Sequence, residues 1–166
     1  MVETLASVGS AASMLANRFE PKRKYRFILE IDGLDAYMIK TTARPTITHE
    51  EITIDWINVK RYLAGKLAFE TLSVTLYDPI APSGAQQVME WVRLCTEQIS
   101  GRSGYSDFYK RDIRLKMLDG VGNVVELWDI IGAWLTNVTF GDTDYAASDA
   151  VEINLTIRYD SAVLQY

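Results

Sequence analysis

Cysteine and histidine are nearly absent from this chain of 166 residues, which contains one of each, Cys95 and His49. A single cysteine cannot form an intrachain disulfide, and this scarcity is typical of proteins in a reducing compartment. A catalytic triad or a histidine metal site would have to use His49, and neither Gly-x-Ser-x-Gly nor His-Glu-x-x-His is present. We therefore expect a protein that is not an enzyme, with no catalytic residues, no cofactor and no metal site.

Long apolar runs are also absent, because no segment approaches the roughly 20 residues that cross a bilayer. The N-terminus carries Glu3 where a secretion signal has basic residues, and its serines and glycine interrupt any apolar stretch. We therefore expect synthesis in a cytoplasm and no membrane insertion.

Two short polar segments invite a functional interpretation that their spacing does not support. Residues 101–104, Gly-Arg-Ser-Gly, are too short for a phosphate-binding loop and lack its Lys-Ser/Thr ending. Asp142, Asp144 and Asp149 lack the glycine and the terminal glutamate of a calcium loop. Both segments are interpreted as surface loops.

Charge is unevenly distributed along the chain, whose net charge of −5 argues against a nucleic-acid-binding protein. Basic residues crowd together near the start, whereas no lysine or arginine lies between Lys116 and Arg158. These regions are either two solvated faces or complementary surfaces on neighbouring copies. The second alternative gives these candidate interface residues: Arg18, Lys22, Arg23, Lys24, Arg26, Asp142, Asp144 and Asp149.

Apolar residues alternate with polar ones over several short segments, which predicts half-buried strands. The clearest segment is 151–159, and Asp32-Gly33 predicts a turn that pairs residues 37–41 back onto the first strand. A loop is expected around Ala64-Gly65 and another over 100–112. The predicted strands cover 25–31, 37–41, 47–57, 67–77, 113–118, 124–131, 134–140 and 151–159.

One helix is expected after Pro82, with Ser83 as its N-cap, Gln86 as a capping-box partner and Gly101 as its end. Its apolar stripe comprises Val88, Trp91, Val92, Cys95 and Ile99. The fold class is thus mainly β, an antiparallel sandwich or barrel with one flanking α-helix. We expect an N-terminal arm over 1–17 and a single β-rich domain over 18–166.

Several motifs, in order, resemble the tail tube proteins of contractile-tailed bacteriophages, the T4-type family. They include Thr41-Thr42-Ala43-Arg44-Pro45 after the second strand, Trp91 in the helix, and Trp134-Leu135-Thr136-Asn137-Val138. The other motifs are 21–31, 58–65, 71–78 and the closing 151–160. Leu135 departs from the proline common in the family, and residues 1–17 have no counterpart.

The resemblance implies a virion structural protein, assembled in the host bacterial cytoplasm as homo-hexameric rings that stack into a hollow tube. Expected partners are a sheath protein, baseplate and tail terminator proteins, and DNA that passes during ejection without specific binding. An acidic, hydroxyl-rich wall, such as region 119–152 could supply, would repel the DNA backbone. The residues expected to line the lumen are Thr71, Ser73, Thr75, Glu152, Asn154, Thr156 and Arg158.

Three other interpretations stay open at this point. A phage-derived contractile injection system uses the same kind of tube for protein cargo. A baseplate or terminator protein of the same fold forms a single ring and does not polymerise. A small β-sandwich hydrolase or binding domain would be a stable monomer with a concave polar site.

Overall fold

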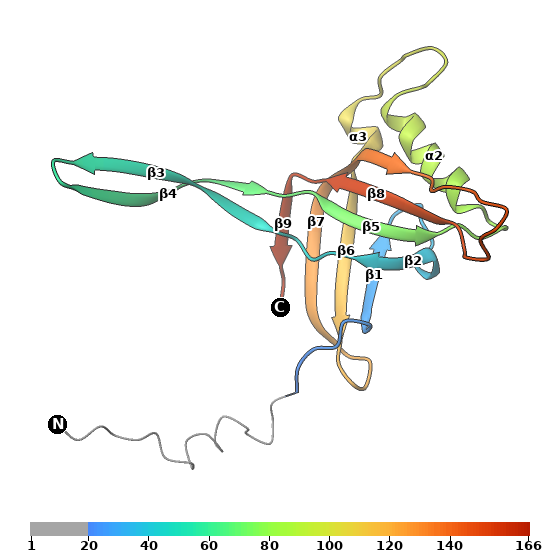
Figure 1. Cartoon of the computed structure of the whole chain (residues 1–166), viewed down its shortest axis with the longest axis horizontal. Helices are drawn as coiled ribbons and strands as arrows, with labels where there is room; N and C mark the ends of the chain where they lie inside the picture. The colour runs from blue at the N-terminus through green and yellow to red at the C-terminus, as the bar shows by residue number, and fades with distance from the viewer. Residues whose placement is uncertain (1–19) are drawn as a thin grey trace.

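The computed structural model describes residues 20–166 (Figure 1). The predicted arm over 1–17, and with it Arg18, lies outside the described residues, so this division of the chain stays a prediction. The strands are β1 (Phe27–Ile31), β2 (Ile39–Thr42), β3 (Ile47–Trp56), β4 (Val59–Phe69), β5 (Leu72–Tyr77), β6 (Arg111–Leu118), β7 (Val124–Thr139), β8 (Glu152–Arg158) and β9 (Ser161–Leu164). The helices are η1 (Ala36–Met38), α2 (Gly84–Cys95) and α3 (Ser106–Tyr109).

Seven strands form one folded sheet in the order β1-β6-β7-β8-β5-β2, with β9 added beside β7, and every pairing is antiparallel. Figure 1 shows that β1, β6, β7 and β9 run steeply across the direction of β2, β5 and β8. We call β1, β6, β9 and the first half of β7 the first sheet. The second sheet contains β2, β5, β8 and the second half of β7. The two pack as an orthogonal sandwich.

Strand β7 belongs to both sheets because it bends midway. Residues up to Ala133 pair with β6, whereas Trp134–Thr139 pair with β8. Gly132 lies at the bend with φ +69°, and a Cβ there would lie 2.3 Å from Asp160 Oδ2. The two strands expected over 124–131 and 134–140 are therefore one continuous strand, joined where only glycine adopts the backbone without strain.

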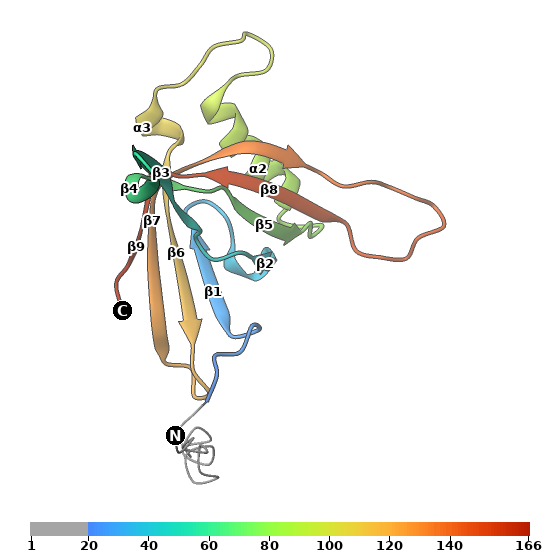
Figure 2. The same cartoon turned by 60° about the vertical axis from the view of Figure 1, so that its left-hand side comes forward.

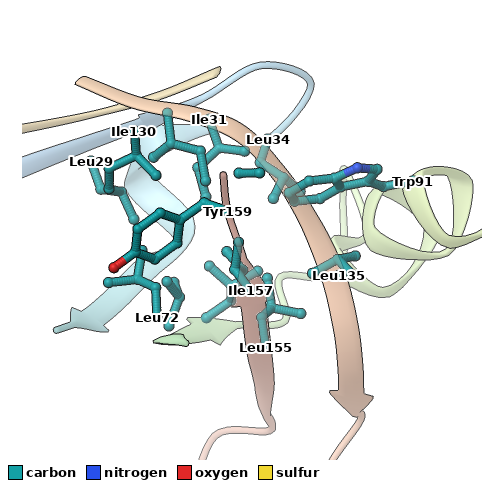
Figure 3. Close-up of a cluster of buried hydrophobic side chains, with 14 of the residues drawn as sticks. Leu29, Ile31, Leu34, Leu72, Trp91, Ile130, Leu135, Leu155, Ile157 and Tyr159 are labelled. Atoms are coloured by element: carbon teal, nitrogen blue, oxygen red, sulfur yellow. The ribbon is translucent and has the colours of Figure 1, made fainter. Parts of the chain in front are cut away.

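Apolar side chains from both sheets fill the space between them (Figure 3). Ile153, Leu155 and Ile157 of β8 are fully buried, as their alternation predicts. Trp91 of α2 closes one end of this core, and its indole Nε1 donates a hydrogen bond to the Tyr109 carbonyl at 2.7 Å. The buried indole thus ties α2 to α3.

Helix α2 is shorter than predicted and is capped differently. It ends at Cys95 rather than before Gly101, and Ile99 lies beyond it with a fully exposed side chain. The Ser83 side chain makes no capping hydrogen bond. Instead Asp78 Oδ1 accepts from the Ala85 N–H at 3.1 Å, because the chain after β5 brings that carboxylate to the first turn.

Two further predictions about strands are wrong. Strand β2 pairs with β5 and not with β1, because η1 redirects the chain after the turn at Gly33. Instead of the predicted loop around Ala64-Gly65 and single strand over 67–77, residues 59–69 form β4, which pairs with β3, and residues 72–77 form the separate strand β5. The loop over 100–112 contains the short helix α3. The predicted fold class is nevertheless confirmed: antiparallel sheets with a flanking helix.

Candidate assembly surfaces

The second sheet has one polar face, because its strands place hydroxyl and amide side chains in register. Thr75 lies opposite Asn154, and its hydroxyl donates to Asn154 Oδ1 at 2.9 Å. Ser73 lies opposite Thr156, which in turn lies opposite Asn137 on β7. Of the predicted lumen-lining residues, the register brings these to one face: Ser73, Thr75, Glu152, Asn154, Thr156 and Arg158.

Thr71, the seventh predicted residue, is exposed and directly precedes β5. The polar face also contains Thr41, Asn137 and Thr139, which the sequence analysis did not select. Each of these three residues lies directly opposite a selected residue on the neighbouring strand, so knowledge of the strand pairing would have identified them. The role of this face in lining a lumen stays a prediction.

Charges are few on the polar face. Lys40 forms an ion pair with Glu152 and lies 5.4 Å from the ring centroid of Tyr77. The hydrogen bond to Glu152 raises the pKa of Lys40 above its ordinary value. This lysine is therefore cationic but already paired, which reduces the charge it offers to a passing anion.

Both edges of the second sheet lack a pairing partner within the described residues. Residues 134–139 of β7 pair with β8 on one side only, and β2 pairs with β5 on one side only. Successive strands alternate in direction, so the second half of β7 and β2 run in opposite directions. A second copy could therefore add its β7 edge to β2 as a further antiparallel strand, and the addition could repeat.

A second feature without a partner is the β3–β4 hairpin, which continues β2 and β5 away from the body (Figure 1). At its root the Ala43 N–H donates to the Ser73 carbonyl of β5, and the Glu70 N–H donates to the Thr46 carbonyl across the two arms of the hairpin. Every residue of β3 is exposed, and β4 is nearly so. Phe69 at the end of β4 packs on the core, with its ring centroid 5.7 Å from that of Tyr159, whereas the outer part of the hairpin extends away from the core (Figure 1).

The outer part of the hairpin is amphipathic. Ile52 lies opposite Leu63 and Trp56 opposite Val59. Ile54 shares their side because it stands two residues from each, and Arg61 lies opposite Ile54 on the same side. The other side contains Thr53 opposite Tyr62, and Asp55 opposite Lys60 at 3.8 Å. An exposed surface with this many apolar side chains indicates a contact with another molecule.

The predicted basic interface residues are partly engaged within the chain. Lys22 forms an ion pair with Glu126, a carboxylate on β7 that is only 6% exposed. Arg44 approaches the same carboxylate at 3.7 Å, and the Trp128 indole donates to it. Burial raises the pKa of Glu126, but these hydrogen bonds and cations outweigh it and hold the pKa below its ordinary value.

Arg26 donates to the Asp119 carbonyl at 2.5 Å and lies against the ring of Tyr25, whereas Arg23 and Lys24 are exposed. On the acidic side, Asp142, Asp144 and Asp149 are exposed in the loop between β7 and β8, which projects from the sheets (Figure 2). The region 119–152 is therefore not one acidic wall, since Glu126 is buried and Asp129 pairs with Arg114. The interface role of the remaining residues stays a prediction.

A groove of about 590 Å³ opens where β1 and β2 diverge. Its apolar lining includes Phe27, Leu115 and Met117, beside Tyr25. Four cationic side chains, and no carboxylate, contribute to the rest of its lining: Lys22, Lys24, Lys40 and Arg44. We call it the seam groove.

Comparison with known proteins shows the family of this chain. No family model matches it. A tail tube protein of Serratia phage KSP90 is 32% identical over 126 residues, which cover 74% of this chain and 71% of that protein. This chain belongs to the tail tube protein family. The resemblance stated from its motifs is confirmed, and the family is one of structural proteins of the phage tail.

Solved structures with the same fold include other tube and terminator proteins. One such chain is in the extended sheath-tube complex of the extracellular contractile injection system PVC. It superposes with a TM-score of 0.70 at 17% sequence identity, and the match covers 92% of this tail tube protein and 96% of that chain. A chain of the tube-terminating cap of the anti-feeding prophage superposes with a TM-score of 0.73 at 17% sequence identity. The match covers 89% of this chain and 92% of that chain. The SPP1 tail tube superposes with a TM-score of 0.58 at 13% sequence identity, and the match covers 87% of this chain and 78% of that chain.

Other site chemistry is sparse in the described residues. Residues 20–166 contain no group of three or more His, Cys, Asp or Glu side chains placed to hold a metal ion. Across the same range, no helix combines the length and apolarity that a bilayer crossing requires. Burial raises the pKa of the half-buried Cys95 thiol, which disfavours the reactive thiolate.

Proposed function

We propose that this chain is the repeating subunit of a phage tail tube, in which hexameric rings stack around a lumen that conducts DNA during ejection. The observation that carries this proposal is the four-stranded second sheet, with one polar face and two open, oppositely directed edges. Joining β2 of one copy to β7 of the next removes both edges, and repetition closes a barrel.

The polar face of the second sheet would then line the lumen, and the core side would face outward. Hydroxyl and amide groups such as those of Ser73, Thr75 and Asn154 offer DNA only exchangeable hydrogen bonds. Phosphate would bind firmly to a wall rich in free lysine and arginine through counterion release. On this face Lys40 is paired with Glu152, whereas Arg158 is exposed and forms no ion pair within the described residues, so the face offers phosphate few free cations.

The proposed edge pairing can be trapped chemically. Thr41 and Thr139 lie on the same face at opposite edges of the second sheet, with β5 and β8 between them. Three strand spacings separate them, about 14 Å, which is too far for a disulfide within one copy. In a Cys95→Ser background, T41C combined with T139C and a short bis-maleimide should give a covalent ladder that ends at the hexamer.

The controls for this experiment are the two single-cysteine variants, which should give no ladder beyond a dimer. Negative-stain microscopy of the same samples should show rings or hollow rods. A chain that stays monomeric at every concentration, with no ladder in the double variant, would refute the proposed function.

A second function is favoured by the likeness to injection-system chains. The same tube could belong to a contractile injection device, whose cargo is protein rather than DNA, and the neighbouring genes would distinguish the two. A terminator role is suggested by the likeness to the PVC sheath/tube terminator, with a TM-score of 0.72 over 90% of this chain. Microscopy separates that role, because a terminator gives single rings and no rods.

In the phage setting, the expected location is the virion tail, after assembly in the host cytoplasm. A sheath, a baseplate and a terminator are the partners such a tube would meet. The basic residues Arg18, Lys22, Arg23, Lys24 and Arg26, and the acidic Asp142, Asp144 and Asp149, remain our proposed subunit contacts. Charge reversal at Arg23 and Lys24 should weaken assembly and leave the monomer folded.

A further inference from the structure

Helix α2 extends past the open β7 edge of the second sheet. Figures 1 and 2 show that its C-terminal end and the loop after it reach beyond the second half of β7. A groove of about 250 Å³ lies there between the helix and the strand, and we call it the α2–β7 groove. None of its lining residues is charged, and its apolar lining comprises Met89, Val92 and Cys95 of α2 with Leu135, Val138 and Phe140.

Strand β2, at the opposite edge, has two residues on the core side of the second sheet. Ile39 lies opposite Leu76 and Thr42 opposite Val74, and both partners are fully buried. Ile39 and Thr42 are therefore on the core side, whereas Thr41 is on the polar face. A strand added at the β7 edge keeps these faces. The core-side residues of the next copy's β2 thus come to the side of β7 on which α2 lies.

The dimensions allow α2 to cover the added strand. Neighbouring strands are about 4.8 Å apart, and an α-helix with its side chains is about 10–12 Å wide. A helix that already extends past β7 therefore lies over the next strand as well. Met89, Val92 and Cys95 are each half-buried in the described chain, so the added strand would cover the part that they leave exposed.

Charge favours the same contact. The seam groove opens beside β2, where Thr42 contributes to its lining, and it contains four cations and no carboxylate. The C-terminal end of an α-helix carries a partial negative charge, and the exposed Glu97 follows the C-cap of α2. Arg93, the basic residue of the last turn, lines an adjacent groove together with Glu90, which offsets its charge. The end of α2 is therefore complementary to the seam groove.

We infer that the C-terminal end of α2 lies over β2 of the next copy in the same ring, at the mouth of the seam groove, so that Val92 and Cys95 face Thr42. This inference rests on the proposed function, since it requires β2 of one copy to join β7 of another. It adds a contact in the outer layer of the ring, where the neighbouring copy completes the α2–β7 groove. Edge pairing and helix packing then hold the same strand from two sides.

The native thiol of Cys95 is the reporter for this contact. In a Thr42→Cys variant that retains Cys95, a short bis-maleimide added during assembly should give a covalent ladder that ends at the hexamer. Within one copy, β2 and the β7 edge are three strand spacings apart, about 14 Å, so the linkage has to join two copies. Burial raises the pKa of the Cys95 thiol, so the reaction is run in mildly alkaline buffer.

Two controls separate this contact from ring closure alone. Thr41→Cys, one residue away on the polar face, should give no ladder with Cys95, because the sheet lies between the two thiols. Thr42→Cys combined with Cys95→Ser should give no ladder beyond a dimer.

A charge placed in the α2–β7 groove tests the contact without a cross-linker. Met89→Lys puts an ammonium group into an apolar groove that faces a cation-rich neighbour, so the fraction of protein in rings should fall at least several-fold. The matched control is Leu94→Lys on the same helix, at a position that is 42% exposed and outside the groove lining, and it should assemble like the parent. Circular dichroism checks that both monomers are folded, and the Thr42→Cys ladder decides if Met89→Lys is not.

The outcomes distinguish this inference from the proposed function. The Thr41→Cys and Thr139→Cys pair reports ring closure alone. If that pair gives its ladder and Thr42→Cys gives none, or if Thr41→Cys and Thr42→Cys are joined equally well to Cys95, the inference is overturned and the proposed function stands. Rings from a folded Met89→Lys variant at the parent's level would overturn it too. Absence of rings and of every ladder would instead refute the proposed function.

Discussion

The cluster around Glu126 allows a test in which two partners of one ion pair respond unequally. The carboxylate is 6% exposed, whereas the side chains of Lys22 and Arg44 are 45% and 61% exposed. Lys22→Met removes the closest cation and leaves a buried charge with the Trp128 N–H donor and the exposed Arg44 guanidinium at 3.7 Å. Glu126→Gln removes the charge, retains an oxygen for Trp128, and frees two cations that water can solvate.

The magnitudes follow from this asymmetry. A lost hydrogen bond to a charged group costs about 1.5–3 kcal/mol, so we expect Lys22→Met to lower the free energy of unfolding by about 2 kcal/mol. Glu126→Gln should cost about 1 kcal/mol or less, because no buried charge remains unpaired. With a urea m-value of about 2 kcal/mol per M, the unfolding midpoint should fall by about 1 M for Lys22→Met. For Glu126→Gln it should fall by at most about 0.5 M.

The assay is urea unfolding, followed by tryptophan fluorescence at protein concentrations where the chain is monomeric. The folded pKa of Glu126 lies below its unfolded value, so its contribution is complete above the unfolded pKa of about 4.3 and is lost as pH falls through the folded pKa. The gap between the parent and Glu126→Gln should therefore shrink in acid. A Glu126→Gln variant less stable than Lys22→Met at pH 7 would refute the reasoning.

Three further predictions concern the body of the fold. Trp91→Ala should lower the free energy of unfolding by about 3–5 kcal/mol in urea, because it empties a fully buried indole site. Gly132→Ala should cost more than about 1 kcal/mol in the same assay, since φ is +69° and its Cβ would meet Asp160; an unchanged midpoint would show that the bend tolerates a side chain. Tyr159, whose pKa burial raises, should ionise after Tyr25, whose pKa the hydrogen bond with Arg26 lowers, when absorbance titrations of Tyr159→Phe and Tyr25→Phe are compared with the parent; ionisation of both at the same pH would contradict the burial of Tyr159.

Alternation predicted the half-buried strands and also the fully exposed β3, but it did not predict most of β4 or β9. Residues 151–159 predicted β8 well, because one side chain in two packs on the core and the pattern reports this directly. The residues of β4 show no such alternation, since both sides of the hairpin face water in the described chain. A register shift opposite Gly65 disrupts the pattern further. The sequence around Ala64-Gly65 therefore indicated a loop.

Pairing partners were harder to predict than strands. The turn at Asp32-Gly33 is present, with Gly33 at φ +77°, but it leads into η1 and not into a hairpin. The partner of β2 is β5, which lies about thirty residues further along the chain, and no local signal encodes that choice. For the candidate site, alternation found one polar face on β5 and β8, and only the register extended it to β2 and β7.

One strand serving two sheets has a consequence for folding fidelity. A shift of β7 by one residue would turn its side chains to the wrong face in both layers at once, because its halves share a single backbone. Glycine at position 132 fixes where the strand passes from one layer to the other, so a misaligned ladder would place a bulkier residue at that corner. Correct alignment is therefore enforced twice, and in the proposed tube every subunit would have that accuracy.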